Sequence, residues 1–110
     1  MSIQDLYKQK RQAAWDAVGV VRNGDAIVVP TGVAEPPALL TALSERRLEL
    51  RDVKVQQILA VRKYGYIDPA TVEHVRHVAF FYGGATRAGG QQGWIDFIPN
   101  CFSEIPGQIE

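Results

Sequence analysis

The segment DAIVVPTGVAEPPALL, residues 25–40, decides the fold of this chain. Its first part, Ala26–Val29, is a short β-branched run between a glycine and a proline, which predicts a strand buried on both faces. A loop is expected over Thr31–Glu35. Pro36-Pro37 can then begin a helix, because the missing N–H of proline costs nothing in the first helical turn. A strand, a glycine loop and a helix in this order are typical of an α/β fold.

The residues before this segment predict a helix. Apolar residues between Ile3 and Val21 recur at steps of three and four, which places them on one helical face. This pattern predicts a single helix that ends near Val21. Asn23-Gly24 follows, and such a pair fits a helix C-terminus because it tolerates left-handed backbone geometry.

The helix after the first strand combines an apolar and a charged part. Leu39, Leu43 and Leu50 mark the face that we expect to point inward. Its last stretch, Glu45–Arg51, is mainly charged and is predicted to lie in solvent.

Further strands are predicted from short apolar or alternating runs downstream. Ala60–Arg76 has no clear assignment, because Gly65 and Pro69 interrupt its pattern. A weak helix is expected over Thr86–Gln92. The predicted strands are Val53–Leu59, Val78–Tyr82 and Trp94–Ile98. This order predicts an α/β fold with a mostly parallel sheet, flanking helices and right-handed crossovers, in one domain over residues 1–110.

The composition excludes several classes of function. With 110 residues, 46% hydrophobic and 22% charged, the chain has the profile of one soluble globular domain. Twelve Lys and Arg balance twelve Asp and Glu, so the net charge attracts neither nucleic acid nor an anionic membrane. No apolar run approaches the roughly 20 residues of a membrane span, and the N-terminus lacks a secretory h-region. The expected compartment is therefore the cytoplasm.

Four stretches, taken together, carry a family resemblance. They are Ala14–Asp25 (AWDAVGVVRNGD), Thr31–Leu40 (TGVAEPPALL), Arg76–Arg87 (RHVAFFYGGATR) and Ile95–Pro106 (IDFIPNCFSEIP). In this order and spacing they resemble the beginning of the acetyl-CoA hydrolase/transferase enzymes, which include 4-hydroxybutyrate and butyrate CoA-transferases. The resemblance implies that the chain is the N-terminal fragment of such an enzyme. One departure is the paired glycine Gly89-Gly90, which disfavours the helix expected there.

The resemblance also implies a chemistry. A full-length member moves CoA between an acyl-CoA and a short-chain carboxylate, or water, through a glutamate that becomes acylated and then carries CoA as a thioester. In the family this glutamate and its oxyanion loop lie in the C-terminal half. No catalytic residue is therefore expected here, CoA is expected as a substrate and not as a covalently bound cofactor, and the isolated chain is expected to be inactive. A missing C-terminal part, a separate subunit or an oligomer would complete the enzyme. The alternative is a non-catalytic module that binds CoA or acyl-CoA, or a subunit of a split enzyme.

Candidate pocket residues follow the first and third predicted strands, because ligands of open α/β sheets bind beyond the carboxyl ends of the strands. Glycine lets a ligand approach the backbone, and a helix N-terminus offers free N–H groups. An arginine can pair with a carboxylate or a CoA phosphate. The candidates are Thr31, Gly32, Glu35, Gly83, Gly84, Thr86 and Arg87. A plain structural role at the helix start remains the alternative for Glu35, and a plain surface position remains the alternative for Arg87.

Other reactive side chains have simpler interpretations. Glu104 is predicted to lie in the first turn of a helix capped by Ser103, where the helix dipole favours an anion. His74 and His77 are three residues apart but have no third ligand nearby, so no metal site is predicted. Cys101 is single, has no basic partner and cannot form an internal disulfide. Dinucleotide and ATP fingerprints are absent.

Overall fold

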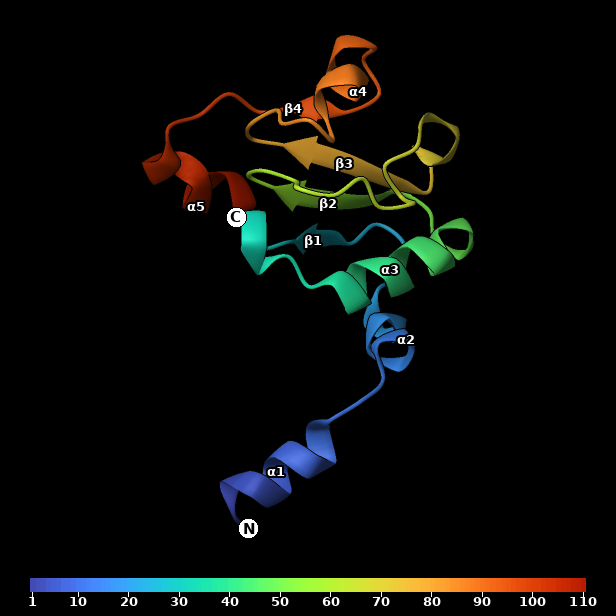
Figure 1. Ribbon diagram of the computed structural model, residues 1–110, viewed down its shortest axis with the longest axis vertical. Coiled ribbons are helices and arrows are strands. Elements are labelled where there is room, and N and C mark those ends of the chain that lie inside the picture. The colour runs from blue at the N-terminus through green and yellow to red at the C-terminus, as the bar shows by residue number, and fades with distance from the viewer.

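A four-stranded parallel sheet forms the centre of the computed structural model, which describes residues 1–110 (Figure 1). The strands lie in the order β1-β2-β3-β4, so each strand pairs with its neighbour in sequence. Their bounds are β1 Ala26–Val28, β2 Val53–Gln57, β3 Val75–Ala79 and β4 Asp96–Phe97. The predicted α/β class with a parallel sheet is confirmed.

Short helices and 3-10 turns connect the strands. The α-helices are α1 Ile3–Lys10, α2 Ala14–Ala17, α3 Pro37–Arg46, α4 Arg87–Gln91 and α5 Ile105–Ile109. The 3-10 turns are η1 Val18–Val20, η2 Gly32–Ala34, η3 Arg47–Glu49, η4 Pro69–Thr71 and η5 Phe102–Glu104. None of the helices combines the length and the apolar character that spanning a bilayer requires.

The hydrophobic core lies on the face of the sheet that α3 covers. Val55 of β2 is paired with His77 of β3 and with Ile27 of β1, and residues paired in this way point to the same face. Val55 is fully buried in one cluster with Leu40 and Leu43 of α3. The alternate residues point to the opposite face, where Lys54 is exposed.

The prediction of a single N-terminal helix that ends near Val21 is wrong. The helix α1 ends at Lys10, and the backbone of Arg11 and Ala13 is extended, with ψ of 126° and 151°. A short α2 follows and leads into η1, which buries Val18. The apolar residues of the pattern therefore serve two different surfaces, because those of α2 and η1 reach the core whereas no residue of α1 is buried.

The strand β1 is an edge strand, so the prediction of burial on both faces is wrong. It pairs with β2 only, and Val28 remains 50% exposed. The next residue, Val29, is buried and follows the strand. The continuous apolar run therefore combines an edge strand with the beginning of the loop that follows it.

Strand boundaries differ from the prediction at β3. The strand begins at Val75, three residues earlier than expected, because the register pairs Val75 with Val53. The aromatic run that suggested the later position leaves the sheet after Ala79, and Phe81 is largely exposed. The other two strands are shorter than predicted: β2 ends at Gln57 and β4 contains only two residues.

The helix α3 has a partly exposed apolar face. Leu43 and Leu50 are buried as predicted, whereas Leu39 is 40% exposed. Burial of Leu50 and partial burial of Arg46 and Arg47 also show that the stretch predicted to lie in solvent is only partly exposed. The reason is that Arg46 belongs to a polar network between helices.

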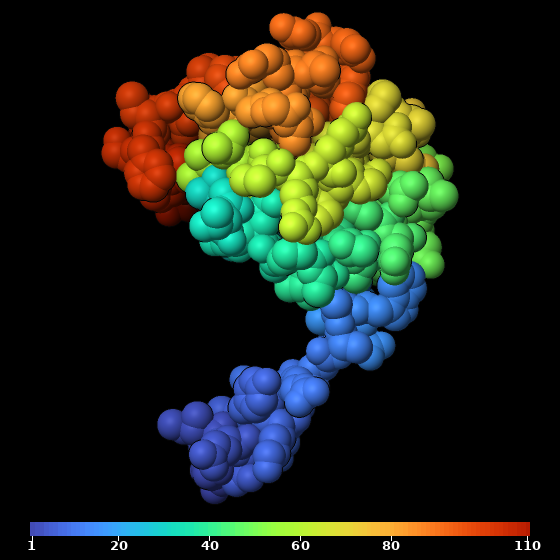
Figure 2. Space-filling model, viewed as in Figure 1, coloured from blue at the N-terminus to red at the C-terminus, as the bar shows by residue number.

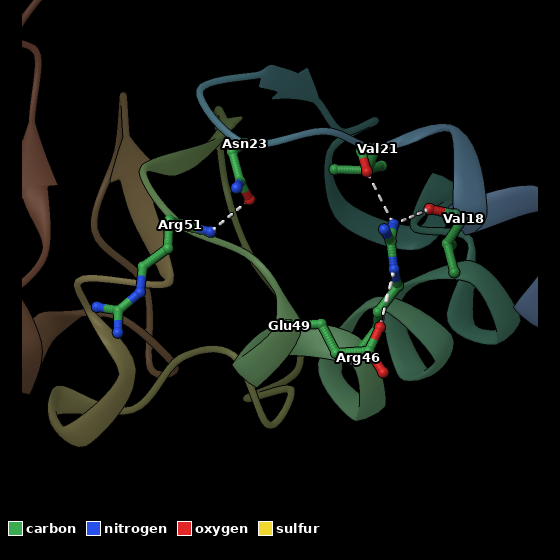
Figure 3. A network of polar contacts seen from close by, with 6 residues as sticks. All are labelled: Val18, Val21, Asn23, Arg46, Glu49 and Arg51. Atoms are coloured by element: carbon green, nitrogen blue, oxygen red, sulfur yellow. Dashed lines mark hydrogen bonds and ion pairs between the residues drawn. The ribbon is translucent and has the colours of Figure 1, made fainter.

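Arg46 joins α3 to the N-terminal segment (Figure 3). Its Nη1 donates to the carbonyl oxygens of Val18 at 2.7 Å and Val21 at 2.8 Å, and its Nε pairs with Glu49 at 3.3 Å. The Val18 carbonyl also accepts from the N–H of Val21, the C-cap residue of η1, at 3.1 Å. The arginine therefore closes the end of η1 and fixes it against α3.

The helix α4 forms despite its paired glycines. A side chain at Gly89 would collide with Ile95, and one at Gly90 would collide with the ring of Tyr82. These glycines let α4 pack directly against Tyr82, which follows β3, and Ile95, which precedes β4. Close packing therefore offsets the low helical propensity of glycine here.

Candidate functional site

Three loops meet at the carboxyl edge of the sheet. The first loop, residues 29–36, follows β1; the middle loop, residues 58–68, follows β2; and the third loop, residues 80–86, follows β3. Because all three strands are parallel and adjacent, their following loops lie side by side. In open α/β sheets this edge is the usual place for ligands.

The first and middle loops are joined by a pair of reciprocal hydrogen bonds. Thr31 Oγ1 donates to the carbonyl oxygen of Leu59 at 3.1 Å and accepts from the Leu59 N–H at 3.0 Å. The N–H of Gly32 donates to the same carbonyl at 3.2 Å. Gly32 has a φ of +61°, a left-handed conformation that favours glycine. Thr31 and Gly32 therefore lie at the predicted edge, and both are fixed to the middle loop.

Glu35, in the first loop, is 8% exposed, and its buried carboxylate also links the first loop to the middle loop. Its Oε1 accepts from the Val61 N–H at 2.7 Å and from Gln57 Nε2 at 2.9 Å. Gln57 Nε2 also donates to the carbonyl oxygen of Pro30 at 3.0 Å. These contacts are structural, but they join Glu35 to β2 and the middle loop and not to the helix start, where the sequence suggests a structural role.

A cleft of about 250 Å³ opens between the first and middle loops. It is lined by Gly32, Val33, Glu35, Pro37, Val61, Arg62 and Tyr64. Arg62 is exposed and forms no ion pair within the chain. The cleft thus combines an apolar rim with an available cation and a buried carboxylate.

The third loop packs against the other side of the middle loop. A Cβ at Gly83 would lie 2.6 Å from Leu59 Cδ1, so the end of the Leu59 side chain would have to move to admit a larger residue. The Gly83 N–H donates to Thr86 Oγ1 at 3.1 Å, and Thr86 is fully buried. Gly84 faces open space and Arg87 is exposed. Of these candidates, Gly84 and Arg87 are accessible to a ligand, whereas Thr86 closes the turn.

The structure therefore brings the predicted candidates to one edge but does not bring the two glycine loops into contact. The middle loop separates them; the sequence predicts its first residues, Ile58 and Leu59, as the end of a strand and gives no assignment from Ala60 onward. The signal that places Leu59–Arg62 between the two loops is topological: sequential parallel strands place the second loop between the first and the third. The local residues, mostly apolar, gave no such signal.

The helix after the first loop offers fewer donors than expected. The N–H groups of Ala34 and Glu35 are already bonded to the carbonyls of Thr31 and Gly32 within η2. The next two residues, Pro36 and Pro37, have no N–H group at all. The helix start thus offers fewer free N–H groups to a ligand than the sequence predicted.

A buried aromatic cluster lies near Glu35. The ring of Tyr66 stacks between Tyr64, at a centroid distance of 6.1 Å, and His77, at 6.2 Å. Burial lowers the pKa of His77 to about 4, against the opposing charge of Glu35. Burial, and secondly the charge of Glu35, raises the pKa of Tyr66. Both side chains are therefore neutral at physiological pH.

The remaining reactive side chains take part in local contacts. Glu104 Oε2 accepts from the Cys101 N–H at 2.6 Å, so the predicted capping role of this region is present. The capping residue is Cys101 and not Ser103, because the turn begins two residues earlier than expected. His74 Nδ1 lies 2.7 Å from the carbonyl oxygen of Leu50, while His77 is buried. No three His, Cys, Asp or Glu side chains are placed to hold a metal ion.

Comparison with known proteins adds a family to this geometry. Residues 1–110 match the family described as the acetyl-CoA hydrolase/transferase N-terminal domain. A succinyl-CoA:cyclohexane-1-carboxylate CoA transferase from Geobacter metallireducens is 34% identical over 105 residues, which are 96% of this chain and 24% of that protein. A 4-hydroxybutyrate coenzyme A transferase from Clostridium kluyveri is 31% identical over 106 residues, 96% of this chain and 25% of that protein.

A solved structure shares the fold. RipA from Yersinia pestis superposes with a TM-score of 0.80 at 24% identity, over 96% of this chain and 27% of its own. At this identity the similarity concerns the fold alone. The chain thus spans about a quarter of the length of the proteins that it matches.

Proposed function

The chain belongs to the acetyl-CoA hydrolase/transferase family, and on that premise we propose that it forms the N-terminal part of an enzyme that transfers CoA between an acyl-CoA and a carboxylate. The observation that carries the proposal is the match of the family's N-terminal domain to all 110 residues. Two relatives with names of CoA transferases, each aligned over 96% of the chain, support the same reaction class.

In the proposed reaction, a glutamate carboxylate attacks the thioester carbonyl of the acyl-CoA and expels the CoA thiolate, leaving an acyl-glutamyl anhydride. The thiolate then attacks the glutamyl carbonyl, which releases the acyl group as a carboxylate and leaves CoA on the glutamate as a thioester. An acceptor carboxylate reverses these two steps, and water in its place gives hydrolysis. In our proposal this glutamate comes from polypeptide outside residues 1–110, so the chain alone is inactive.

The contribution of this chain is one wall of the pocket. Gly32 and Gly84 have open space where a side chain would stand, so a ligand can approach the backbone there. Arg87 and Arg62 are exposed and unpaired, and a guanidinium binds a carboxylate or a CoA phosphate through paired hydrogen bonds. Thr31 hydrogen-bonds the first loop to the middle loop. The buried side chains of Glu35 and Thr86 stabilise the conformation of the loops through their own hydrogen bonds.

A chimera tests this proposal. Residues 1–110 would replace the homologous N-terminal quarter of the 4-hydroxybutyrate coenzyme A transferase from Clostridium kluyveri, to which the chain is 31% identical. We expect the purified chimera to transfer CoA to 4-hydroxybutyrate, and the isolated chain to transfer none. Circular dichroism and a thermal unfolding curve would establish that the chimera is folded.

Two outcomes would contradict the proposal. A folded chimera without CoA-transferase activity would show that this chain is not a working N-terminal part. Transfer of CoA at an enzymatic rate by the isolated chain would show that the reacting carboxylate lies within residues 1–110. An Arg87→Ala chimera adds a finer test, because loss of a carboxylate or phosphate contact raises KM, whereas Arg22→Ala, at an exposed position away from the edge loops, leaves KM unchanged.

A further inference from the structure

We draw no further inference here: the strongest candidate, the apolar groove of about 480 Å³ along the edge strand β1 together with the exposed apolar face of α1, the helix that stands apart in Figure 2, carries nothing, because in a chain that spans about a quarter of its relatives nothing in the structure shows what covers these two surfaces.

Discussion

Glu35 Oε1 lies 2.9 Å from Gln57 Nε2, and this buried contact links the loop after β1 to the last residue of β2. The same oxygen accepts from the Val61 N–H, so a single carboxylate fixes the end of a strand and the loop that follows it. Gln57 is 1% exposed and in turn bonds the carbonyl of Pro30. The shape of the cleft between the first and middle loops therefore depends on Glu35.

Replacing Glu35 should destabilise the fold in proportion to the acceptors that are lost. Glu35→Ala leaves the part-buried Val61 N–H without its acceptor and removes one of the two bonds of Gln57, at a cost of about 2 kcal/mol. Glu35→Gln keeps an acceptor oxygen at the same place and should lose about half as much. Urea unfolding measures both, with the exposed Glu45→Ala as control. Equal stability of Glu35→Ala and Glu45→Ala would disprove the supporting role of Glu35.

Stability should fall as the pH falls below about 6.5. The pKa of His77 is lowered to about 4 by burial, so the unfolded chain, with a histidine pKa near 6.5, binds the proton more readily than the folded one. The stabilisation is complete above pH 6.5 and is lost between pH 6.5 and 4, and the shift corresponds to about 3 kcal/mol. Thermal unfolding from pH 4 to 8 measures this dependence.

A His77→Phe variant isolates this effect. Neither ring nitrogen of His77 has a hydrogen-bond partner, so an apolar ring removes no hydrogen bond while it keeps the packing against Tyr66. The variant should flatten the pH dependence between 4 and 6.5. A pH dependence that persists in His77→Phe would mean that another group titrates.

Arg46 should contribute far more to stability than a surface arginine of the same helix–strand connection. Arg46→Met keeps the aliphatic packing but removes the donors to the carbonyls of Val18 and Val21, and we expect a loss of about 2 kcal/mol. Arg51→Met removes only an exposed pair with Glu73 at 3.4 Å, which contributes at most about 0.5 kcal/mol. Chemical denaturation of the two variants compares them directly, and similar losses would contradict the role given to Arg46.

The sequence predicts the sheet better than its boundaries. Alternation around Val53 and Val55 indicates β2 because one face of that strand is buried and the other is not. The aromatic run ending at Tyr82 has the same local signature as a strand, yet pairing of Val75 with Val53 decides where β3 begins. Register is a contact between distant segments, and local propensity does not contain it.

In the candidate site, too, the sequence predicts local turns but not the arrangement of the loops relative to one another. Gly32 has a left-handed φ that favours glycine, Gly83 leaves room for the Leu59 side chain, and both lie at the carboxyl edge of the sheet as predicted. The middle loop lies between them, and its first residues, including Leu59, are apolar and carry no turn signal, so its place depends on strand order. Similarly, periodicity identifies the apolar face of α1, but the break after Lys10 is invisible in the pattern.

The glycine pair in α4 gives a test in which helix propensity and packing have opposite signs. Gly89→Ala should gain about 1 kcal/mol of propensity, but its methyl group would run into Ile95, which is buried in the core. Overpacking of this kind costs about 1–3 kcal/mol, so we expect a net loss of stability. Gly107→Ala, in the exposed helix α5, meets no atom within 4 Å and should be neutral or stabilising. If urea unfolding showed both alanines to be stabilising, the close packing of α4 on Ile95 would not be the reason for glycine at position 89.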